Sequence, residues 1–417
     1  SEWAKNSNWT DNYVPEAYED IVFATEDNNR GIIQGMSGPG AGKGAAVKDL
    51  YLDGENHNYK DTNEPSGGRI IKDLINDSDV DLVITTTNQL IIDGEVKDNK
   101  PDAGTIVVKS AESEATGTLL FSNPSKNGSV NATVEFYNKA FTCPDCGFYR
   151  KQWQYFGIPV DKSKFPYLSP QVETINEWME NVDGNKWVNR AANHVLEAFR
   201  GYEINNSNTT KPTNIYDFSG ILNVGNAVVA LTKTSNVNYS GMNLIANSFT
   251  AAIPINSDAI KYSDASWDGN LYLFNTGTRD QWRKLNGGTV NHDTQSGQYK
   301  VVPLHVAGNA GLPSTIPSMH TFMVNAPSSG TMTLKYDQLV KNELVDGMAW
   351  RSAQAEKREI PHIVVDVIGS NSADRVWLFE QAGTTRGFDA GWDGVKMPEK
   401  DIVQIYVAGE DAKENYQ

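Results

Sequence analysis

The sequence predicts an all-β protein. Short runs rich in Val, Ile, Leu, Tyr and Phe recur along the whole chain, and Gly, Asn, Asp and Ser separate them. Many of these runs alternate apolar and polar residues, which is typical of a strand with one buried face. A stripe with helical i, i+4 spacing is confined to Trp187, Ala191, Val195 and Phe199. Its flanking Asn and Gly residues are equally typical of turns, so helix and turn both remain open there.

Seven strands are expected in the first third of the chain. Their residues are 20–24, 47–52, 81–85, 90–92, 105–109, 118–121 and 132–137. The hexapeptide from Leu50 to Glu55 (LYLDGE) returns forty positions later as Leu90 to Glu95 (LIIDGE). Forty positions equal two coils of about twenty residues, a period that stacked repeats show. We therefore predict a short right-handed parallel β-solenoid over residues 1–140, with Asp-Gly at its corners. Two ordinary hairpins with Asp-Gly turns are the alternative.

From about residue 141 the expected strands are longer and richer in Trp and Tyr. They cover residues 152–157, 227–232, 270–274, 299–302, 321–324, 331–336, 362–367, 375–379 and 402–406. Turn signals about every 8–15 residues predict antiparallel β-sandwich modules. We assign one to residues 141–340 and a second, incomplete one to residues 341–417.

The composition excludes several classes of protein. Lys and Arg number 36 against 52 Asp and Glu, a formal net charge of −16. So acidic a surface repels phosphate backbones, which argues against nucleic-acid binding. No apolar run approaches the ~18 residues that a membrane-spanning helix needs. The acidity itself is explained by solubility, or alternatively by binding of a divalent cation or a basic surface.

The segment from Ser37 to Gly44 (SGPGAGKG) resembles the phosphate-binding loop of nucleotide kinases. That loop needs a Ser or Thr directly after its Lys to hold Mg²⁺, followed by a helix. Here Gly44 and Ala45 follow Lys43, and the next residues alternate like a strand. We interpret the segment as a turn and predict no cofactor.

Both cysteines lie in one motif, Cys143-Pro-Asp-Cys146. A redox-active pair needs the start of a helix in an α/β fold, and a zinc site needs two further ligands. The six histidines are scattered singly. We predict a structural disulfide that closes a small loop, with paired free thiols as the alternative.

Two acidic clusters are weak candidates for a metal site. The segment from Asp77 to Asp81 (DSDVD) resembles the start of a calcium loop but lacks its Gly and its bidentate Glu. Asp389 and Asp393 lie in a predicted tight turn, where they could converge on Ca²⁺. Asx-turns, in which each carboxylate bonds its own backbone, are the favoured interpretation. We found no nucleophile elbow, zinc-protease helix or Ser/Cys–His pair in a recognisable context.

Five segments, in order, resemble secreted adhesin-like surface proteins of Bacteroidetes. They are residues 151–159 (KQWQYFGIP), 218–225 (FSGILNVG), 241–247 (GMNLIAN), 316–324 (IPSMHTFMV), and 374–379 with 387–396 (DRVWLF, GFDAGWDGVK). The third is similar to a G-W-N-L-x-x-N-P signature, except that Met242 replaces Trp and Ser248 replaces Pro. The resemblance implies a β-solenoid joined to β-sandwich modules, a cell-surface or outer-membrane location, and no catalytic residue that we could map. The chain begins at Ser1, as expected of a processed protein.

Within such a fold, Asn243 and Asn247 are expected to cap backbone groups at the two ends of an apolar strand. Five aromatic residues are expected to fill the space between sheets, namely Trp153, Tyr155, Tyr272, Phe274 and Trp282. We predict a non-enzymatic extracellular protein that forms a rigid scaffold and binds host or neighbouring-cell glycan or protein, or assembles with itself. A carbohydrate-active enzyme or carbohydrate-binding protein is the main alternative, and a phage-type shaft is another.

Overall fold

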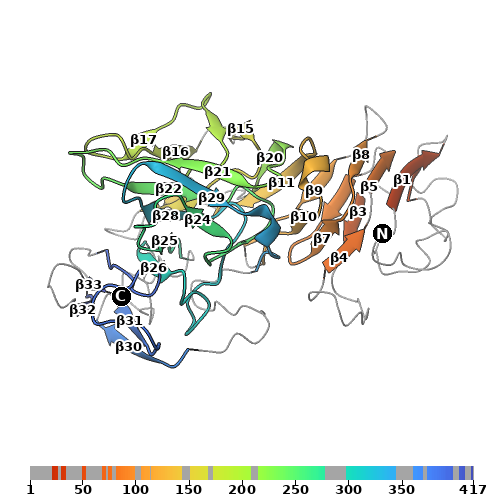
Figure 1. Ribbon diagram of the computed structural model, residues 1–417. Helices are drawn as coiled ribbons and strands as arrows, with labels where there is room; N and C mark the ends of the chain where they lie inside the picture. Colours follow the sequence, from red (N-terminus) through yellow and green to blue (C-terminus); the bar gives the residue numbers. More distant parts are fainter. Residues whose placement is uncertain are drawn as a thin grey trace.

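Strands make up almost all regular structure of the computed structural model (Figure 1). The structure describes residues 21–26, 30–33, 49–52, 68–71, 74–77, 81–98, 105–112, 114–142, 151–167, 172–207, 215–277, 297–343, 360–369, 373–397, 403–408 and 415–416. Within these residues the helical segments are two 3₁₀ turns, η2 (Pro124–Lys126) and η4 (Tyr336–Gln338). The predicted all-β class is confirmed.

Three ladders of mainly parallel strands lie within residues 21–137, which we call the parallel-strand region. The first holds β3 (Asp49–Leu52), β6 (Asp81–Ile84), β9 (Ile106–Val108) and β11 (Asn131–Tyr137). The second holds β4 (Gly68–Ile71), β7 (Gln89–Ile92) and β10 (Thr118–Phe121). The third holds β5 (Leu74–Asp77) and β8 (Val96–Asp98), with β1 (Ile21–Glu26) beside β5 and β2 (Arg30–Ile33) antiparallel to β1. Successive strands of the chain therefore belong to successive ladders, and Figure 1 shows them stacked at one end of the molecule.

The stacked strands follow the predicted twenty-residue coil only in part. Gly68 pairs with Gln89, 21 positions later, and Leu74 with Val96, 22 positions later. The first ladder has longer intervals. Leu82 pairs with Leu50, 32 positions earlier, and with Ile106, 24 positions later. The two hexapeptide copies lie in different ladders, because Leu50 belongs to β3 and Leu90 to β7. The repeat therefore does not mark equivalent positions, since connections of unequal length separate the strands.

One of the two expected Asp-Gly corners lies in the described part of the chain. Asp93 and Gly94 form the bend between β7 and β8, as predicted. Gly94 does not adopt positive φ there; the bend between β6 and β7 does use it, at Thr87 with φ 64°. The other pair, Asp53 and Gly54, lies outside the described residues.

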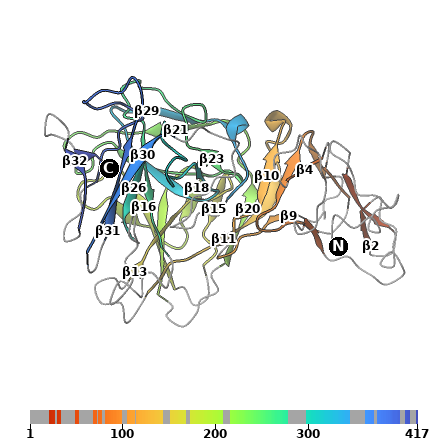
Figure 2. The same cartoon turned by 90° about the horizontal axis from the view of Figure 1, so that it is seen from below.

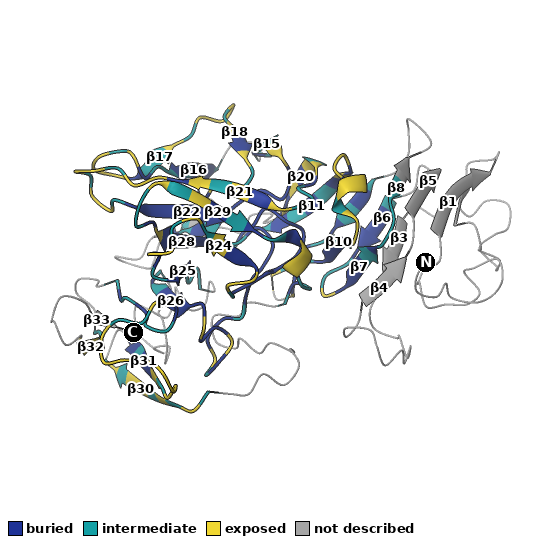
Figure 3. Ribbon diagram, in the orientation of Figure 1, coloured by how far each residue is buried: buried dark blue, intermediate teal, exposed yellow. Residues whose placement is uncertain are grey.

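Inward-facing side chains fill the part of the parallel-strand region from β6 to β11, where burial is described. Along β11 the residues Ala132, Val134 and Phe136 are buried, whereas the alternate residues are exposed or half-buried. Ile106 and Val108 of β9 follow the same rule. Each buried aliphatic side chain contributes about 1.5–3 kcal/mol, so this alternation drives the stacking. Figure 3 shows the buried faces.

The body of the molecule consists of antiparallel sheets. One is β14 (Gln154–Phe156), β19 (Tyr202–Asn206), β16 (Glu173–Trp178) and β17 (Trp187–Asn189), in that order. A second is β22 (Met242–Ala246), β28 (Thr321–Asn325), β25 (Asn270–Phe274) and β26 (Tyr299–Pro303). A third is β21 (Ala227–Leu231), β29 (Gly330–Leu334) and β24 (Ile260–Tyr262). Short pairs join β12 (Phe141–Thr142) to β13 (Lys151–Gln152), β15 (Lys162–Lys164) to β18 (Val195–Glu197), and β23 (Ile253–Pro254) to β27 (Thr315–Ile316).

The stripe from Trp187 to Phe199 is not a helix. Trp187 starts β17, Val195 starts β18, and a turn separates the two strands. Trp187 pairs with Trp178 across the sheet, and their rings meet edge to face at 5.2 Å. The i, i+4 spacing is therefore coincidental, and the turn-like Asn and Gly residues were the better signal.

Two asparagines cap β22 as predicted. Asn243 accepts a hydrogen bond from the Thr232 backbone N–H (3.0 Å) and donates to the Thr232 and Gly241 carbonyls. Asn247 donates to the carbonyls of Ala251 and Ile316 and accepts from the Phe249 N–H. The interior of the fold thus contains a few fully bonded amides.

The parallel-strand region and the body share one continuous hydrophobic core. β20 (Ile215–Ile221) pairs antiparallel with β11 along seven residues, so the first ladder continues into the body. Asn342, 2% exposed, donates from Nδ2 to the carbonyls of Gly117 and Thr250 and accepts from the Ser318 N–H. Figure 2, a view from below, shows the ladders joining the body at its side.

A hairpin lies at the opposite end of the body from the ladders (Figure 1). It consists of β30 (His362–Ile368) and β31 (Ala373–Phe379). Trp377 anchors it by donating from its indole N–H to the Ala310 carbonyl at 3.1 Å. β32 (Val407–Ala408) and β33 (Asn415–Tyr416) form a further short pair.

Candidate functional site

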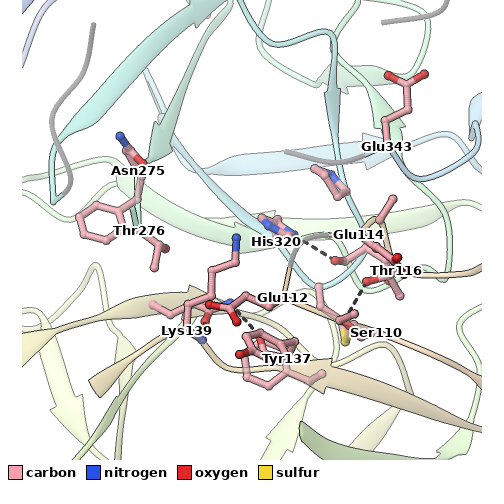
Figure 4. Close-up of a pocket in the computed structure, with 18 of the residues that line it drawn as sticks. Ser110, Glu112, Glu114, Thr116, Tyr137, Lys139, Asn275, Thr276, His320 and Glu343 are labelled. Atoms are coloured by element: carbon pink, nitrogen blue, oxygen red, sulfur yellow. Dashed lines mark hydrogen bonds between the residues drawn. The ribbon is translucent and has the colours of Figure 1, made fainter. Parts of the chain in front are cut away.

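A pocket of about 110 Å³ lies where the parallel-strand region meets the body (Figure 4). The connection from β9 to β10 supplies Glu112 and Glu114, and the residues after β11 supply Lys139. The body supplies His320, just before β28, and Glu343. Segments far apart in the sequence therefore build the pocket, so no local motif could reveal it.

His320 is held in one orientation at the edge of this pocket. Its Nδ1 lies 3.1 Å from the Ser318 carbonyl oxygen, which can only accept a hydrogen bond. Burial lowers the pKa of His320 to about 4, and the Lys139 charge acts in the same direction. The ring is therefore neutral at pH 7, with the proton on Nδ1 and an acceptor lone pair on Nε2.

A strand edge without a neighbour is the second notable feature. β21 is the first strand in the order β21-β29-β24. The Ser263 N–H donates to the Thr331 carbonyl, so Thr331 faces β24, whereas Met332 faces β21 and bonds Val229. The N–H and C=O groups of Val228 and Ala230 consequently point outward, where the described residues offer them no partner.

A groove of about 480 Å³ runs along this edge. Residues 228–232 form one wall, and residues 243–245 of β22 and 197–201 form the other. The two walls meet where Asn243 bonds Thr232. Val228 is 67% exposed, an unusual position for a large β-branched side chain. An exposed apolar edge beside a groove is suited to accept an additional strand.

Asp389 and Asp393 are engaged in the hydrogen bonds of one turn. Asp389 accepts from the Thr385 N–H (2.5 Å), and Asp393 accepts from the Asp389 N–H (2.7 Å). Burial raises the pKa of Asp393, and the neighbouring Asp389 charge adds to the effect. Each carboxylate bonds the backbone N–H of the residue four positions before it, so these two bonds are not those of an Asx-turn, in which the bonded N–H follows the acidic residue. Among the described residues, no three His, Cys, Asp or Glu side chains converge as a metal site would require.

Several predicted features lie outside the described residues. They are Cys143 and Cys146, the loop from Ser37 to Gly44, and Trp282. In the other acidic cluster, Asp81 accepts a hydrogen bond from the Thr105 N–H at 2.7 Å and so links two connections of the parallel-strand region.

Three of the aromatic residues predicted to fill inter-sheet space, Tyr155, Tyr272 and Phe274, pack between sheets. Tyr155 stacks on Phe274 with ring centroids 4.0 Å apart, and Tyr272 is buried beside Met323. Trp153 is half-buried. These rings join sheets to one another.

An all-β scaffold with a free strand edge is typical of cell-surface structural proteins, and the comparison with known proteins supports that class. The chain is 45% identical, over 427 aligned residues, to the minor fimbrium subunit Mfa5 of Porphyromonas gingivalis. The alignment takes in the whole chain but only a third of the relative's length. No protein-family model and no solved structure matches the chain.

This similarity supports in part the predicted resemblance to surface proteins of Bacteroidetes, because the relative is a fimbrium subunit. It also confirms the predicted extracellular location at the cell surface. Within the described residues, no helix has the length and apolarity to cross a membrane.

Proposed function

We propose that the chain is part of a non-enzymatic structural or adhesive protein of a surface fimbria. Its partner is an extended segment of a neighbouring fimbrial protein, which adds to the free edge of β21. The similarity to a fimbrium subunit supports a structural role, and the outward-facing backbone groups of Val228 and Ala230 carry the assignment of the edge.

We further propose that residues 1–140 form the predicted right-handed β-solenoid, a stiff extension from the body. The parallel pairing of β3, β6, β9 and β11 supports this proposal, because such pairing needs a crossover between every two neighbours. We propose that the other two domains of the chain are β-sandwich modules, one at residues 141–340 and one at residues 341–417.

An adhesive role toward host or neighbouring-cell glycan or protein belongs to the same proposal, and carbohydrate binding or cleavage is its rival. A glycan array combined with an assay of reducing-sugar release separates the two. We expect no release of sugar; turnover of any polysaccharide would reject the non-enzymatic assignment.

A charged substitution at the edge tests the strand-addition proposal. Val228→Lys places a charge on the edge and disfavours pairing with another strand, while the exposed side chain leaves the fold intact. In cells that produce the full-length protein, we expect immunogold labelling of surface filaments to fall severalfold.

Thr331→Lys is the matched control, because Thr331 is also exposed and lies on the neighbouring inner strand opposite Ala230. Labelling of filaments should then stay normal. Equal labelling with Val228→Lys and the unchanged protein would reject β21 as the site of assembly.

The disulfide between Cys143 and Cys146 also remains a proposal. When the non-reduced protein is treated with an alkylating reagent, mass spectrometry should find Cys143 and Cys146 unmodified. Alkylation of both cysteines would contradict the disulfide.

A further inference from the structure

The pocket at the junction has apolar walls and several hydrogen-bond acceptors. Glu112 and Glu114 are exposed at its mouth and Glu343 is half-buried in its wall. Glu114 accepts a hydrogen bond from the Thr86 hydroxyl through Oε2, and its other oxygen bonds none of the described residues. The neutral His320 ring adds an acceptor nitrogen at the pocket's edge (Figure 4). A ligand that matches this lining must donate several hydrogen bonds.

The charges at the pocket also favour a cation. The lining holds three carboxylates, those of Glu112, Glu114 and Glu343, and two ammonium groups, one of which is that of Lys139. The other lysine of the lining, Lys300, is directed elsewhere, because its Nζ lies over the Trp377 ring, 5.7 Å from the centroid. The lining therefore carries an excess of negative charge at neutral pH.

The volume of the pocket and its apolar walls restrict the ligand further. About 110 Å³ accommodates a group of several non-hydrogen atoms, since one water needs about 10–15 Å³. Tyr137 and Phe274 are half-buried at its walls and offer apolar surface for methylene groups. Acidic mouth, acceptor lining and apolar walls together fit a charged nitrogen on a short alkyl chain.

We propose that this pocket binds a single alkylguanidinium or alkylammonium group, carried by a free amine or by an Arg or Lys side chain of a partner protein. The assignment is independent of the role of the β21 edge, which lies on other strands.

A ligand-observed NMR titration of the whole chain tests the proposal. The probes are agmatine, a free guanidinium, and the capped peptide Ac-Gly-Arg-Gly-NH₂, with Ac-Gly-Gln-Gly-NH₂ as the uncharged comparison. We expect saturable binding of the first two and none of the third. Tighter binding of the Arg peptide than of agmatine would identify the protein side chain as the source; the reverse would identify the free amine.

Variants of the lining give the sharper test. Glu343→Gln should weaken agmatine binding about fivefold, the equivalent of one partly exposed ion pair, whereas Lys139→Met should strengthen it because a repulsive charge is removed. Glu380→Gln, an exposed carboxylate on the distant hairpin, should have no effect. Absence of saturable binding by both guanidinium probes, or an affinity unchanged by Glu343→Gln and Lys139→Met, would overturn the proposal.

Discussion

At the scale of single residues, Glu203 is a buried carboxyl group whose ionised form is disfavoured by burial. It is 6% exposed on β19, and burial raises its pKa to about 7. The Asn176 amide donates to Oε1 at 2.7 Å and opposes the shift only in part. The folded protein therefore holds the proton more tightly than the unfolded chain does.

We predict that Glu203 makes the protein lose stability as the pH rises. Below about pH 4.5 the Glu203 carboxyl is protonated in both the folded and the unfolded state and does not change the free energy of unfolding. Between pH 4.5 and 7 the unfolded chain ionises first, so the free energy of unfolding falls by about 3 kcal/mol. Glu203→Gln should therefore stabilise at pH 8 and have little effect at pH 4, measured by denaturant unfolding at both values.

The exposed Glu380→Gln is the control and should give no such pH dependence. A change in stability from Glu203→Gln that is equal at pH 4 and pH 8 would show that Glu203 does not titrate as inferred.

At the scale of elements, the body depends on amides that replace strand pairing at strand ends. Asn247 follows β22 directly, is completely buried, and serves two carbonyls and one N–H. Because a carbonyl left without a donor in the interior costs about 1–3 kcal/mol, this residue fixes where β22 stops.

Asn247→Asp is predicted to destabilise the protein by more than about 3 kcal/mol at pH 7. It preserves the shape but removes both donors and buries a charge opposite two carbonyl oxygens. Thermal unfolding measures the loss. Asn131→Asp, the same change at an exposed position of β11, should shift the melting temperature little, and equal shifts would contradict the role of Asn247.

Strands with regular alternation could be predicted from the sequence, and long-range geometry could not. The expected strand at residues 132–137 is β11, since Ala132, Val134 and Phe136 mark its buried face. The strand expected at residues 402–406 is not regular where the structure describes it; β32 starts at Val407, after Ile405 N–H bonds the Asp374 carboxylate. His320 looked like one of six scattered histidines, because its partners in the pocket come from other parts of the chain. The unpaired edge of β21 could not be predicted either, because the residue pattern of Ala227–Leu231 would be the same whether or not another strand paired with that edge.

At the scale of the whole molecule, Asn342 connects the parallel-strand region to the body. Besides its amide bonds to Gly117, Thr250 and Ser318, its backbone N–H donates to the Thr118 hydroxyl at 2.8 Å. One buried side chain thus satisfies polar groups from both parts.

Asn342→Ala is predicted to uncouple unfolding of the two parts. The Gly117 carbonyl and the Ser318 N–H lose their partner, each at a cost of about 1–3 kcal/mol, and the Thr250 carbonyl keeps only the Leu119 N–H at 3.4 Å. The loss falls on the junction alone. Differential scanning calorimetry should then show two transitions, or one broadened transition, in place of a sharper one. Gln338→Ala, an exposed change in the adjacent η4 turn, should leave the profile unchanged, and an equally sharp profile for Asn342→Ala would refute the coupling.

The way the body meets β10 has a consequence for aggregation. β10 is the last strand of its ladder, and its outer side meets isolated groups. Thr250 bonds Leu119 twice, through its hydroxyl to the Leu119 carbonyl and through its carbonyl to the Leu119 N–H, and the Phe121 N–H bonds the Tyr336 hydroxyl. These contacts end the ladder, because Thr250 and Tyr336 present no regular row of backbone donors and acceptors with which a strand of a second copy could pair. A shortened chain without residues 215–342 would expose the outer side of β10 and would be expected to polymerise end to end, so the body also keeps the stacked ladders from becoming an open-ended fibre.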